Sequence, residues 1–529
     1  MPLTELTLPP HIAFDQALLR EAMFRKANLR DSEGAGFRIM HRSIDARPRV
    51  PVVNVHCLVS EGALDEPLLQ YDRAKLPNVA AAAKRVLIVG AGPAGLFAAL
   101  RLIELGFKPI VVERGSDVRA RRRDLADINK KHIVNPESNY CFGEGGAGTY
   151  SDGKLYTRSK KRGDIRRILE IMVAHGAVEE ILYEAHPHIG TNKLPALVQA
   201  WRETILERGG EVLFNTRVDD LVLKRGQIIG VLTNHGESIL ADATILATGH
   251  SARDIFELLH RREVLIEAKP YAIGVRVEHQ QKLIDQIQYR CQGSRDPLMP
   301  AASYSLVTQV PYGGVEKGVF SFCMCPGGFI VPAATAPGEL VVNGMSPSRR
   351  DSTYANSGIV VSVDQDDWKD YQDAGPLAGL RLQQAVEQAA WAAGGSTQTA
   401  PAQLLHDFTK GRTSSHLHPT SYQPGLKSVA FQDFLPPQIA QRLMGGFVAF
   451  GHKMKGYVSN DAQIIGVESR TSSPVRIPRD KVSLMHPELK GFFPCGEGAG
   501  YAGGIMSAAM DGERCAEAAV AFINGVPLA

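Results

Sequence analysis

The stretch RVLIVGAGPAGLFAALRLIELGFKPIVVERG, residues 85–115, decides the fold. Its first five residues form a short apolar run rich in β-branched side chains, which is typical of a parallel strand buried on both faces. Gly90, Gly92 and Gly95 follow with the GxGxxG spacing. The first glycine permits a tight turn, the second lets the backbone approach a pyrophosphate, and the third lets the next helix pack closely on the strand.

The rest of this stretch completes a nucleotide-binding unit. Pro93 and Ala94 open a helix that ends near Gly106, and a second strand over residues 109–112 leads to Glu113 and Arg114. An acid about 20 residues after the glycines accepts hydrogen bonds from a ribose. The phosphates are expected at the positive end of the helix. Strand, glycines, helix, strand and acid in this order predict a bound dinucleotide.

Length and charge limit the possible classes of protein. A chain of 529 residues exceeds one ordinary core, so two or three domains are expected. The formal net charge of +3 gives no reason to expect nucleic acid or an anionic membrane as the main partner. No apolar run is long enough to span a bilayer, and the N-terminus lacks the order of a signal peptide. We therefore expect a cytoplasmic protein that acts on a small molecule. Its oligomeric state is left open.

The seven cysteines are scattered and contain no CxxC motif. A disulfide framework or a metal site is therefore not expected. Cys323 and Cys325 are expected to share one face of a strand, where two small core hydrophobes are favoured over a redox or metal pair. The missing CxxC also argues against electron transfer through an active-site disulfide.

Two further segments point to the same ligand. Residues 139–156, NYCFGEGGAGTYSDGKLY, are dense in glycine and hydroxyl groups, so their backbone could lie against a flat ligand. The polar and glycine contacts expected there are Gly148, Thr149, Ser151, Asp152 and Lys154. After a strand near Val218 and a small meander, a buried strand ends in Ala247, Thr248 and Gly249.

At this point the chain resembles the large family of two-dinucleotide-binding-domain flavoproteins with the glutathione reductase type of FAD site. The resemblance implies FAD at the first motif, a backbone contact with the adenine near Val218, and a cofactor role for the Ala247–Gly249 triplet. Residues 491–518 are the second anchor of this resemblance. There Glu497, where the family commonly has Asp, is implied to bind the ribitol, and a helix N-terminus is implied to face the flavin. The residues implied in this block are Gly496, Glu497, Gly503, Gly504 and Ile505.

The expected fold class is α/β, with a discontinuous Rossmann-like FAD-binding domain, an inserted antiparallel-sheet α+β substrate domain and a small N-terminal α+β module. The module is expected over residues 1–80 and the first part of the FAD-binding domain over 84–264. The insertion is expected over 265–440, because a series of strands there breaks the βα alternation and is interrupted by a helix over 366–391. Residues 441–529 are expected to return to the FAD-binding domain.

No catalytic residue is assigned firmly from the sequence. Weak candidates lie in polar loops, and their histidines have the proton-transfer chemistry that a redox enzyme uses. They are His186, His188, Arg350, Asn356, His416 and His418.

Several motifs, among them FGEGGAGTYSDGKL and VESRTSSPVRIPRD, make the whole chain resemble bacterial FAD-dependent dehydrogenases of unassigned substrate. The resemblance itself brings no settled reaction. The first hypothesis is an FAD-dependent oxidoreductase that moves a hydride between flavin and a small organic substrate, with NAD(P)H as a candidate transient donor. One alternative is an FAD-dependent monooxygenase. Another is a flavoprotein that binds RNA or a protein through its N-terminal module, although no basic stripe interleaved with aromatic residues supports RNA.

Overall fold

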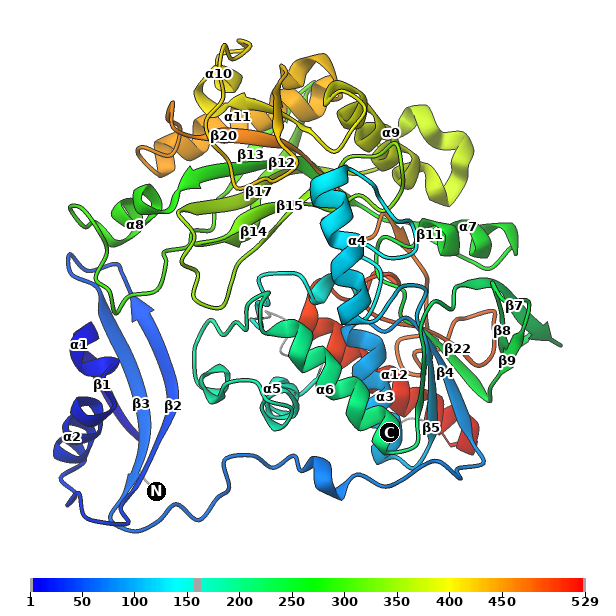
Figure 1. Cartoon of the computed structure of the whole chain (residues 1–529), viewed down its shortest axis with the longest axis horizontal. Coiled ribbons are helices and arrows are strands. Elements are labelled where there is room, and N and C mark those ends of the chain that lie inside the picture. The colour runs from blue at the N-terminus through cyan, green and yellow to red at the C-terminus, as the bar shows by residue number, and fades with distance from the viewer. Residues whose placement is uncertain (1–2, 157–162, 527–529) are drawn as a thin grey trace.

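The computed structural model describes residues 3–156 and 163–526. The ends of the expected first and last domains, residues 1–2 and 527–529, lie outside the described residues. Figure 1 shows an N-terminal module at one side, a parallel-sheet domain below and an antiparallel-sheet domain above, with a long linker between the module and the parallel sheet. No helix in the described ranges is both long and apolar enough to cross a bilayer.

The N-terminal module is a three-stranded antiparallel sheet with strand order β1-β3-β2 and two helices. Alternate residues of its central strand are buried, from Val53 to Val59, and pack against Leu19, Met23 and Phe24 of α2. This period of two is what a strand with one covered face requires. Its elements are β1 (Leu3–Leu8), α1 (Pro10–Ala13), α2 (Gln16–Ala27), β2 (Gly36–Asp45) and β3 (Val52–Ser60).

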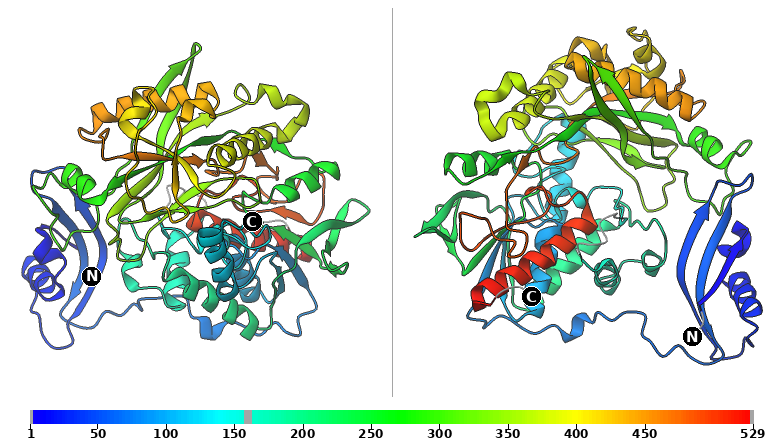
Figure 2. Two further views of the ribbon diagram at one scale, coloured as in Figure 1. Left: turned by 45° about the horizontal axis from the view of Figure 1, so that its top comes forward. Right: turned by 180° about the vertical axis from the view of Figure 1, so that it is seen from behind.

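The module contacts the main body at the edge strand β2 and at the turn after it, where Arg290 donates to the carbonyl of Arg47 at 3.3 Å. The backbone N–H of Arg42 donates to the carbonyl of Tyr183 at 2.8 Å, and the N–H of Ala185 donates to the carbonyl of Arg42 at 2.9 Å. The Arg42 guanidinium also forms an ion pair with Glu184 at 2.5 Å. Both views in Figure 2 show the module standing beside the main body, with the linker running between them.

The parallel-sheet domain has five strands in the order β22-β10-β4-β5-β6. The strand over 85–89 is central, and Val86–Val89 are buried, as expected for a strand covered on both faces. The edge strand β22 comes from near the end of the chain, so this sheet is built from segments that are far apart in the sequence. The strands are β4 (Arg85–Val89), β5 (Lys108–Val112), β6 (Glu211–Leu213), β10 (Ala243–Leu246) and β22 (Phe492–Pro494).

Helices cover one face of this sheet, and a small three-stranded meander with a helix packs on the other. The C-terminal helix α12 lies directly against α3, as Figure 2 shows from behind. A Cβ added at Gly512 of α12 would come within 2.1 Å of the carbonyl oxygen of Ala94 in α3, so only glycine allows this approach. The elements are α3 (Pro93–Glu104), α4 (Val118–Lys131), α5 (Ile165–Ala174), α6 (Leu194–Glu207), β7 (Val218–Lys224), β8 (Gln227–Thr233), β9 (Ser238–Leu240), α7 (Arg253–Arg261) and α12 (Ile505–Asn524).

The antiparallel-sheet domain is built on a seven-stranded sheet with the order β13-β14-β17-β12-β20-β18-β19. Only β18 and β19 within it pair in parallel. A separate core of aliphatic and aromatic residues lies between this sheet and its helices. The elements are β12 (Tyr271–Gln280), α8 (Gln281–Tyr289), β13 (Val307–Tyr312), β14 (Val315–Cys325), β17 (Tyr354–Val363), α9 (Ala378–Ala393), β18 (Ala400–Leu404), α10 (Leu405–Thr409), β19 (Leu426–Ser428), α11 (Pro437–Lys453) and β20 (Gln463–Glu468).

Three details of this domain differ from the expectations. The helix expected over 366–391 is broken, because Gly375 has a φ of 56° and Pro376 follows it, so α9 begins only at Ala378. The short strands β15 (Phe329–Pro332) and β16 (Val342–Met345) form their own two-stranded sheet. The division expected at residue 440 falls inside α11, and β20 still belongs to the large sheet. We propose a boundary after residue 471. Two further short strands, β11 (Glu267–Ala268) and β21 (Val475–Arg476), pair with each other.

Candidate functional site

A cavity of about 380 Å³ lies between the parallel-sheet domain and the antiparallel-sheet domain. Its walls come from the carboxyl ends of β4, β5 and β10, from the glycine-rich segment after α4, and from β14 and β16. Ligands of open α/β sheets bind at the carboxyl ends of the strands. Eighteen of the residues expected to contact the cofactor line this cavity, namely Gly90, Gly92, Pro93, Ala94, Glu113, Arg114, Gly148, Ser151, Asp152, Lys154, Val218, Ala247, Thr248, Gly249, Glu497, Gly503, Gly504 and Ile505.

The other three expected contacts lie behind the wall. A Cβ at Gly95 would meet the carbonyl oxygen of Gly90 at 1.9 Å, so this glycine allows the tight turn between β4 and α3. Thr149 is fully buried and donates to the carbonyl of Glu144 at 2.8 Å. The backbone N–H of Gly496 donates to Asp511 at 2.8 Å. These residues shape the wall but do not face the cavity.

The N-termini of two helices meet at this cavity. Gly92 is the N-cap of α3, and Gly504 is the N-cap of α12; neither has a side chain that could cap its helix. Both glycines and the first residue of each helix line the cavity. The first N–H groups of each helix have no partner within the helix and carry partial positive charge. The cavity therefore offers two places for negatively charged groups.

The carboxylate of Glu113 lies at the end of β5 and is held firmly. It accepts hydrogen bonds from the backbone N–H groups of Ala91 at 2.9 Å, Gly115 at 3.0 Å and Gly143 at 2.9 Å. These contacts join three loops at the mouth of the sheet. They also fix the orientation of an acid whose remaining lone pairs can accept from a ligand hydroxyl.

A buried arginine supports the glycine-rich segment. The guanidinium of Arg121 donates to the carbonyl oxygens of Asn139, Glu144 and Gly146, each at 2.8 Å, and its side chain is fully buried. Burial lowers the pKa of Arg121 from its usual value. The segment that follows α4 is therefore held in place by one cation bound to three carbonyl groups.

Several glycines leave space where a flat or extended ligand can approach the backbone. A Cβ built on Gly92, Gly249, Gly503 or Gly504 would meet no atom within 4 Å, although each lines the cavity. The hydroxyl of Thr248 is buried in the wall without a hydrogen-bond partner within the described residues. Open backbone, two helix N-termini and an unused hydroxyl together fit a dinucleotide.

One end of the cavity carries an ion-paired cluster. Asp152 is almost fully buried and forms an ion pair with Arg350 at 2.6 Å. Lys154 donates to the carbonyl of Met324, and its ammonium lies 3.8 Å from Asp152. Burial raises the pKa of Asp152, but Lys154 and Arg350 outweigh this effect and lower it. Asp152 is therefore an anion that positions two cations at this end.

Glu497 and His250 face each other in the same wall, with 3.6 Å between Glu497 Oε2 and His250 Nε2. Burial raises the pKa of Glu497 to about 7 and lowers the pKa of His250 to about 4. Near neutral pH the imidazole is therefore neutral, and the carboxyl group is close to its titration point. A group with such a pKa can hold or release a proton at working pH.

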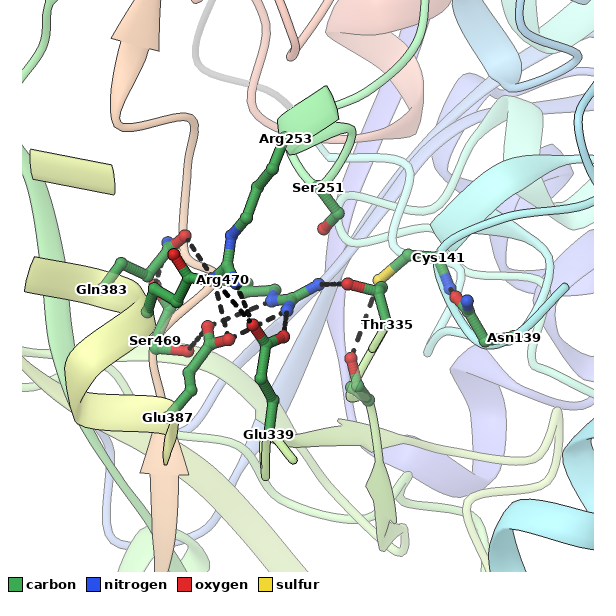
Figure 3. A network of polar contacts seen from close by, with 12 residues as sticks. Asn139, Cys141, Ser251, Arg253, Thr335, Glu339, Gln383, Glu387, Ser469 and Arg470 are labelled. Atoms are coloured by element: carbon green, nitrogen blue, oxygen red, sulfur yellow. Dashed lines mark hydrogen bonds and ion pairs between the residues drawn. The ribbon is translucent and has the colours of Figure 1, made fainter. Parts of the chain in front are cut away.

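A network of buried charges lies behind the cavity and joins the two domains (Figure 3). Arg253 of α7 pairs with Glu339 at 2.6 Å and with Glu387 of α9 at 2.7 Å. Arg470, which follows β20 and lines the cavity, pairs with the same two acids at 3.1 Å and 2.9 Å. Two cations and two anions balance, as buried charges require.

The six weak catalytic candidates do not line the cavity. Arg350 contacts a lining residue through its ion pair with Asp152. Asn356 is buried and accepts from Arg276 at 2.7 Å. The ring of His188 contacts the carbonyl of Ser348 at 3.1 Å, and burial lowers its pKa.

The other three candidates are histidines held by other contacts. His186 packs against Tyr156, a residue that lines the cavity, with 5.1 Å between ring centroids. His416 is exposed and packs against His418, whose ring contacts the carbonyl of Asn460 at 2.6 Å. Loop polarity alone did not tell which of these groups would face the ligand.

One group of potential metal ligands occurs among the described residues, formed by Cys495, Asp511 and Cys515. The guanidinium of Arg479 lies in it, 2.6 Å from Asp511 and 3.2 Å from the sulfur of Cys515. Two of the three donor groups, Asp511 and Cys515, are therefore already in contact with a cation.

Sequence reasoning missed the wall that comes from the antiparallel sheet. The residues concerned are Phe322, Cys323, Asn343, Arg470 and Thr471. The Cys-Met-Cys-Pro-Gly-Gly run after Phe322 was a usable signal, because proline and two glycines after a strand indicate a break in regular pairing. The expectation that Cys323 and Cys325 share a core face was wrong. A register shift between Phe322 and Cys325 breaks the alternation, so Cys323 lines the cavity and Cys325 is buried.

Comparisons with known proteins agree with this architecture. Residues 84–259 match the family described as pyridine nucleotide-disulphide oxidoreductase, and residues 270–471 match FAD-dependent protein, C-terminal domain-like. Residues 2–60 match a domain of unknown function.

Two curated relatives differ in how much of the chain they share. An uncharacterized protein of Clostridium beijerinckii is 40% identical over 518 residues, which are 95% of this chain and 96% of the relative. A thiamine thiazole synthase of Aeropyrum pernix is 29% identical over 182 residues, 32% of this chain and 55% of that protein. Among solved structures, CtdE in complex with FAD has a TM-score of 0.30 at 11% identity and covers 83% of this chain and 84% of its own.

Proposed function

The chain belongs to the family of its Clostridium beijerinckii relative and is an FAD-dependent oxidoreductase, and from this premise we propose that it moves a hydride between bound FAD and a small organic substrate. NAD(P)H is proposed as a transient co-substrate. The eighteen expected residues that line the cavity, from Gly90 to Ile505, are proposed to hold the FAD.

The observation that carries this proposal is the composition of the cavity wall. The parallel-sheet domain contributes the glycines and helix N-termini, and the antiparallel-sheet domain contributes Phe322, Cys323 and Asn343. Sites for small organic molecules combine apolar surface with a few fixed polar groups. A wall of this kind beside a dinucleotide site supports a substrate position next to the flavin.

The residues of the chain have definite tasks in this proposal. FAD, when bound, supplies the hydride chemistry itself. The N-terminus of α12, beginning at Gly504, offers positive potential to negative charge that develops on a reduced ligand. The carboxyl group of Glu497, with a pKa near 7, can take up or give a proton at Oε2.

The test is anaerobic reduction followed by absorbance. The purified protein, loaded with FAD, is mixed with NADH or NADPH in a stopped-flow instrument, and loss of the flavin absorbance band is recorded. Fast bleaching with one nicotinamide supports the proposal. A flavin that neither nicotinamide reduces contradicts the role of NAD(P)H and directs the search to another electron donor.

Two further measurements separate the alternatives. Stoichiometric use of dioxygen with a hydroxylated product would favour an FAD-dependent monooxygenase. A shift of labelled RNA that weakens with salt would favour binding through the N-terminal module. A cytoplasmic location stays a prediction.

A further inference from the structure

Lys154 lies where the two domains meet at the cavity. Its side chain is 37% exposed, and its ammonium donates to the carbonyl of Met324 in β14. The backbone beside it is held in place, because the N–H of Leu155 donates to the carbonyl of Pro187 at 2.9 Å. An ammonium has three donors, and among the described residues only Met324 accepts from this one. Two N–H groups of a fixed lysine are therefore left for a ligand in the cavity.

Two cations share one acid at this end of the cavity. Asp152 is only 1% exposed and pairs with Arg350 at 2.6 Å, whereas the Lys154 ammonium lies 3.8 Å from it, beyond hydrogen-bond distance. Burial opposes the charge of Asp152, but Lys154 and Arg350 lower its pKa, so the carboxylate stays ionised. The three side chains therefore carry one surplus positive charge.

The other charges of the cavity wall do not cancel this surplus. Burial raises the pKa of Glu497 to about 7, so this acid carries only part of a charge near neutral pH. Each of the three arginines that line the cavity already pairs with two acids. These pairs are Arg114 with Glu137 and Asp254, Arg217 with Glu137 and Asp219, and Arg470 with Glu339 and Glu387.

The wall that faces Lys154 suits an organic group. Phe322 of β14, Asn343 of β16 and Tyr156 all line the cavity, and β14 lies against β16. The backbone N–H of Gly344 donates to Asn343 Oδ1 at 2.7 Å, which fixes the amide, and the amide nitrogen donates to no described residue. Sites for small molecules combine apolar surface with a few placed polar groups. Two aromatic rings, an amide donor and an ammonium with free donors make such a site for a molecule with one negative group.

We propose that the small organic substrate is a monocarboxylate, whose carboxylate binds the Lys154 ammonium beside the flavin, with the Asn343 amide as a second donor. One surplus positive charge matches one negative group, because charges taken out of water are balanced. A phosphate dianion would leave one negative charge uncompensated. The inference rests on the proposed function and adds the class of substrate to it. A contact of Lys154 with FAD is compatible with it, since the ammonium has two free donors.

Binding of simple carboxylates tests the proposal without any turnover. The protein loaded with FAD is titrated with acetate, butyrate and benzoate, and with the three corresponding amides, at constant ionic strength. The change in flavin absorbance gives each Kd. We expect at least one carboxylate to bind at least ~10-fold more tightly than its amide, because only the acid carries the charge. Lys154→Met should remove this preference, and Lys154→Arg should keep it.

A second variant keeps the test decisive if Lys154→Met does not fold. Asn343→Asp preserves the shape of the side chain but adds a negative charge, so it should weaken carboxylate binding at least ~10-fold and leave amide binding unchanged. Lys224→Met is the matched control, since Lys224 is exposed at the end of β7, and it should bind both ligands as the wild type does. The Tm of each loaded variant shows whether its fold is intact.

The proposal is overturned if no carboxylate binds more tightly than its amide. It is also overturned if Lys154→Met, or Asn343→Asp where the first variant does not fold, keeps the preference of the wild type. Failure of NADH and NADPH to reduce the flavin would contradict the proposed electron donor but would leave carboxylate binding as expected. The two failures are therefore distinguishable.

Discussion

The guanidinium of Arg253 lies 2.7 Å from the carboxylate of Glu387, and this ion pair joins α7 of the parallel-sheet domain to α9 of the antiparallel-sheet domain. Glu387 is fully buried and also holds Arg470, a residue of the cavity wall. Glu387 therefore holds a residue of the cavity wall and, at the same time, joins the two domains. Removing the acid would leave two arginines short of a partner.

We expect Glu387→Gln to lower the free energy of unfolding by about 3–5 kcal/mol, because breaking a buried pair leaves uncompensated charge. Urea unfolding measures this. Glu257→Gln is the matched control, since Glu257 of α7 pairs with Arg381 of α9 at 2.9 Å but both side chains are substantially exposed. The control should cost less than about 1 kcal/mol. Equal losses in the two variants would contradict a special role for the buried network.

Gly92→Ala should separate cofactor binding from folding. The added Cβ would meet no protein atom within 4 Å and would point into the cavity. We expect the apoprotein to lose less than about 1 kcal/mol of stability, as for a modest change at an N-cap, while FAD binds at least ~10-fold more weakly. Fluorescence titration of apoprotein with FAD measures the affinity.

Substitutions at two other glycines are the controls for Gly92→Ala. Gly95→Ala would place its Cβ 1.9 Å from the carbonyl of Gly90, so it should destabilise the fold itself by about 1–3 kcal/mol. Gly62→Ala, in the linker, has free space around its Cβ and should change neither property. Unchanged FAD affinity in Gly92→Ala would show that the cofactor lies elsewhere.

Arg121→Leu should loosen the glycine-rich segment, because three carbonyl groups lose their shared donor. Hydrogen bonds to a charged group contribute more to stability than neutral ones, so we expect the free energy of unfolding to fall by about 2–5 kcal/mol. Hydrogen exchange followed by mass spectrometry should become faster over residues 139–148. Arg123 lies two residues along, on an exposed side of α4. Arg123→Leu should leave the free energy of unfolding within about 0.5 kcal/mol of the wild type and should not change the exchange rate over residues 139–148. Slow exchange in Arg121→Leu would show that other contacts hold the segment.

Glu497 should make the stability of the apoprotein depend on pH. Its pKa rises from 4.5 to about 7 on folding because burial disfavours the charged form. The folded state therefore binds the proton more tightly than the unfolded state. The contribution of this group to the free energy of unfolding is fully present below about pH 4.5 and is lost as the pH rises through 7. Part of the side chain stays open to the cavity, so we expect a loss of about 1–2 kcal/mol.

Glu497→Gln removes this titration. Between pH 5 and pH 8 the variant should therefore gain about 1–2 kcal/mol of unfolding free energy relative to the wild type. Urea unfolding of the two apoproteins measures this difference. Glu237→Gln, at an exposed turn, should run parallel to the wild type. A parallel profile for Glu497→Gln as well would show that Glu497 ionises normally in the fold.

Much of the parallel-sheet domain was predictable because its signals are local. Residues 85–115 contain strand, turn glycines, helix, second strand and acid within one short unit, and hydrophobic periodicity and glycine spacing report each step. In the structure β4 pairs directly with β5, and α3 packs against both strands. The C-terminal block around Glu497 was placed only by its resemblance to known flavoproteins, since nothing local says that β22 joins a sheet begun four hundred residues earlier.

The order of elements and the cofactor unit were therefore determined by the sequence alone, because backbone turns and periodic burial depend on near neighbours. The tertiary structure decided which side chains face the cofactor. Cys323 reaches the cavity because a bulge against β17 reverses its side, and Arg470 reaches it because Glu339 and Glu387, from distant segments, neutralise its charge. Burial, ion pairing and pKa arise from contacts between segments far apart in the chain, which no local pattern encodes.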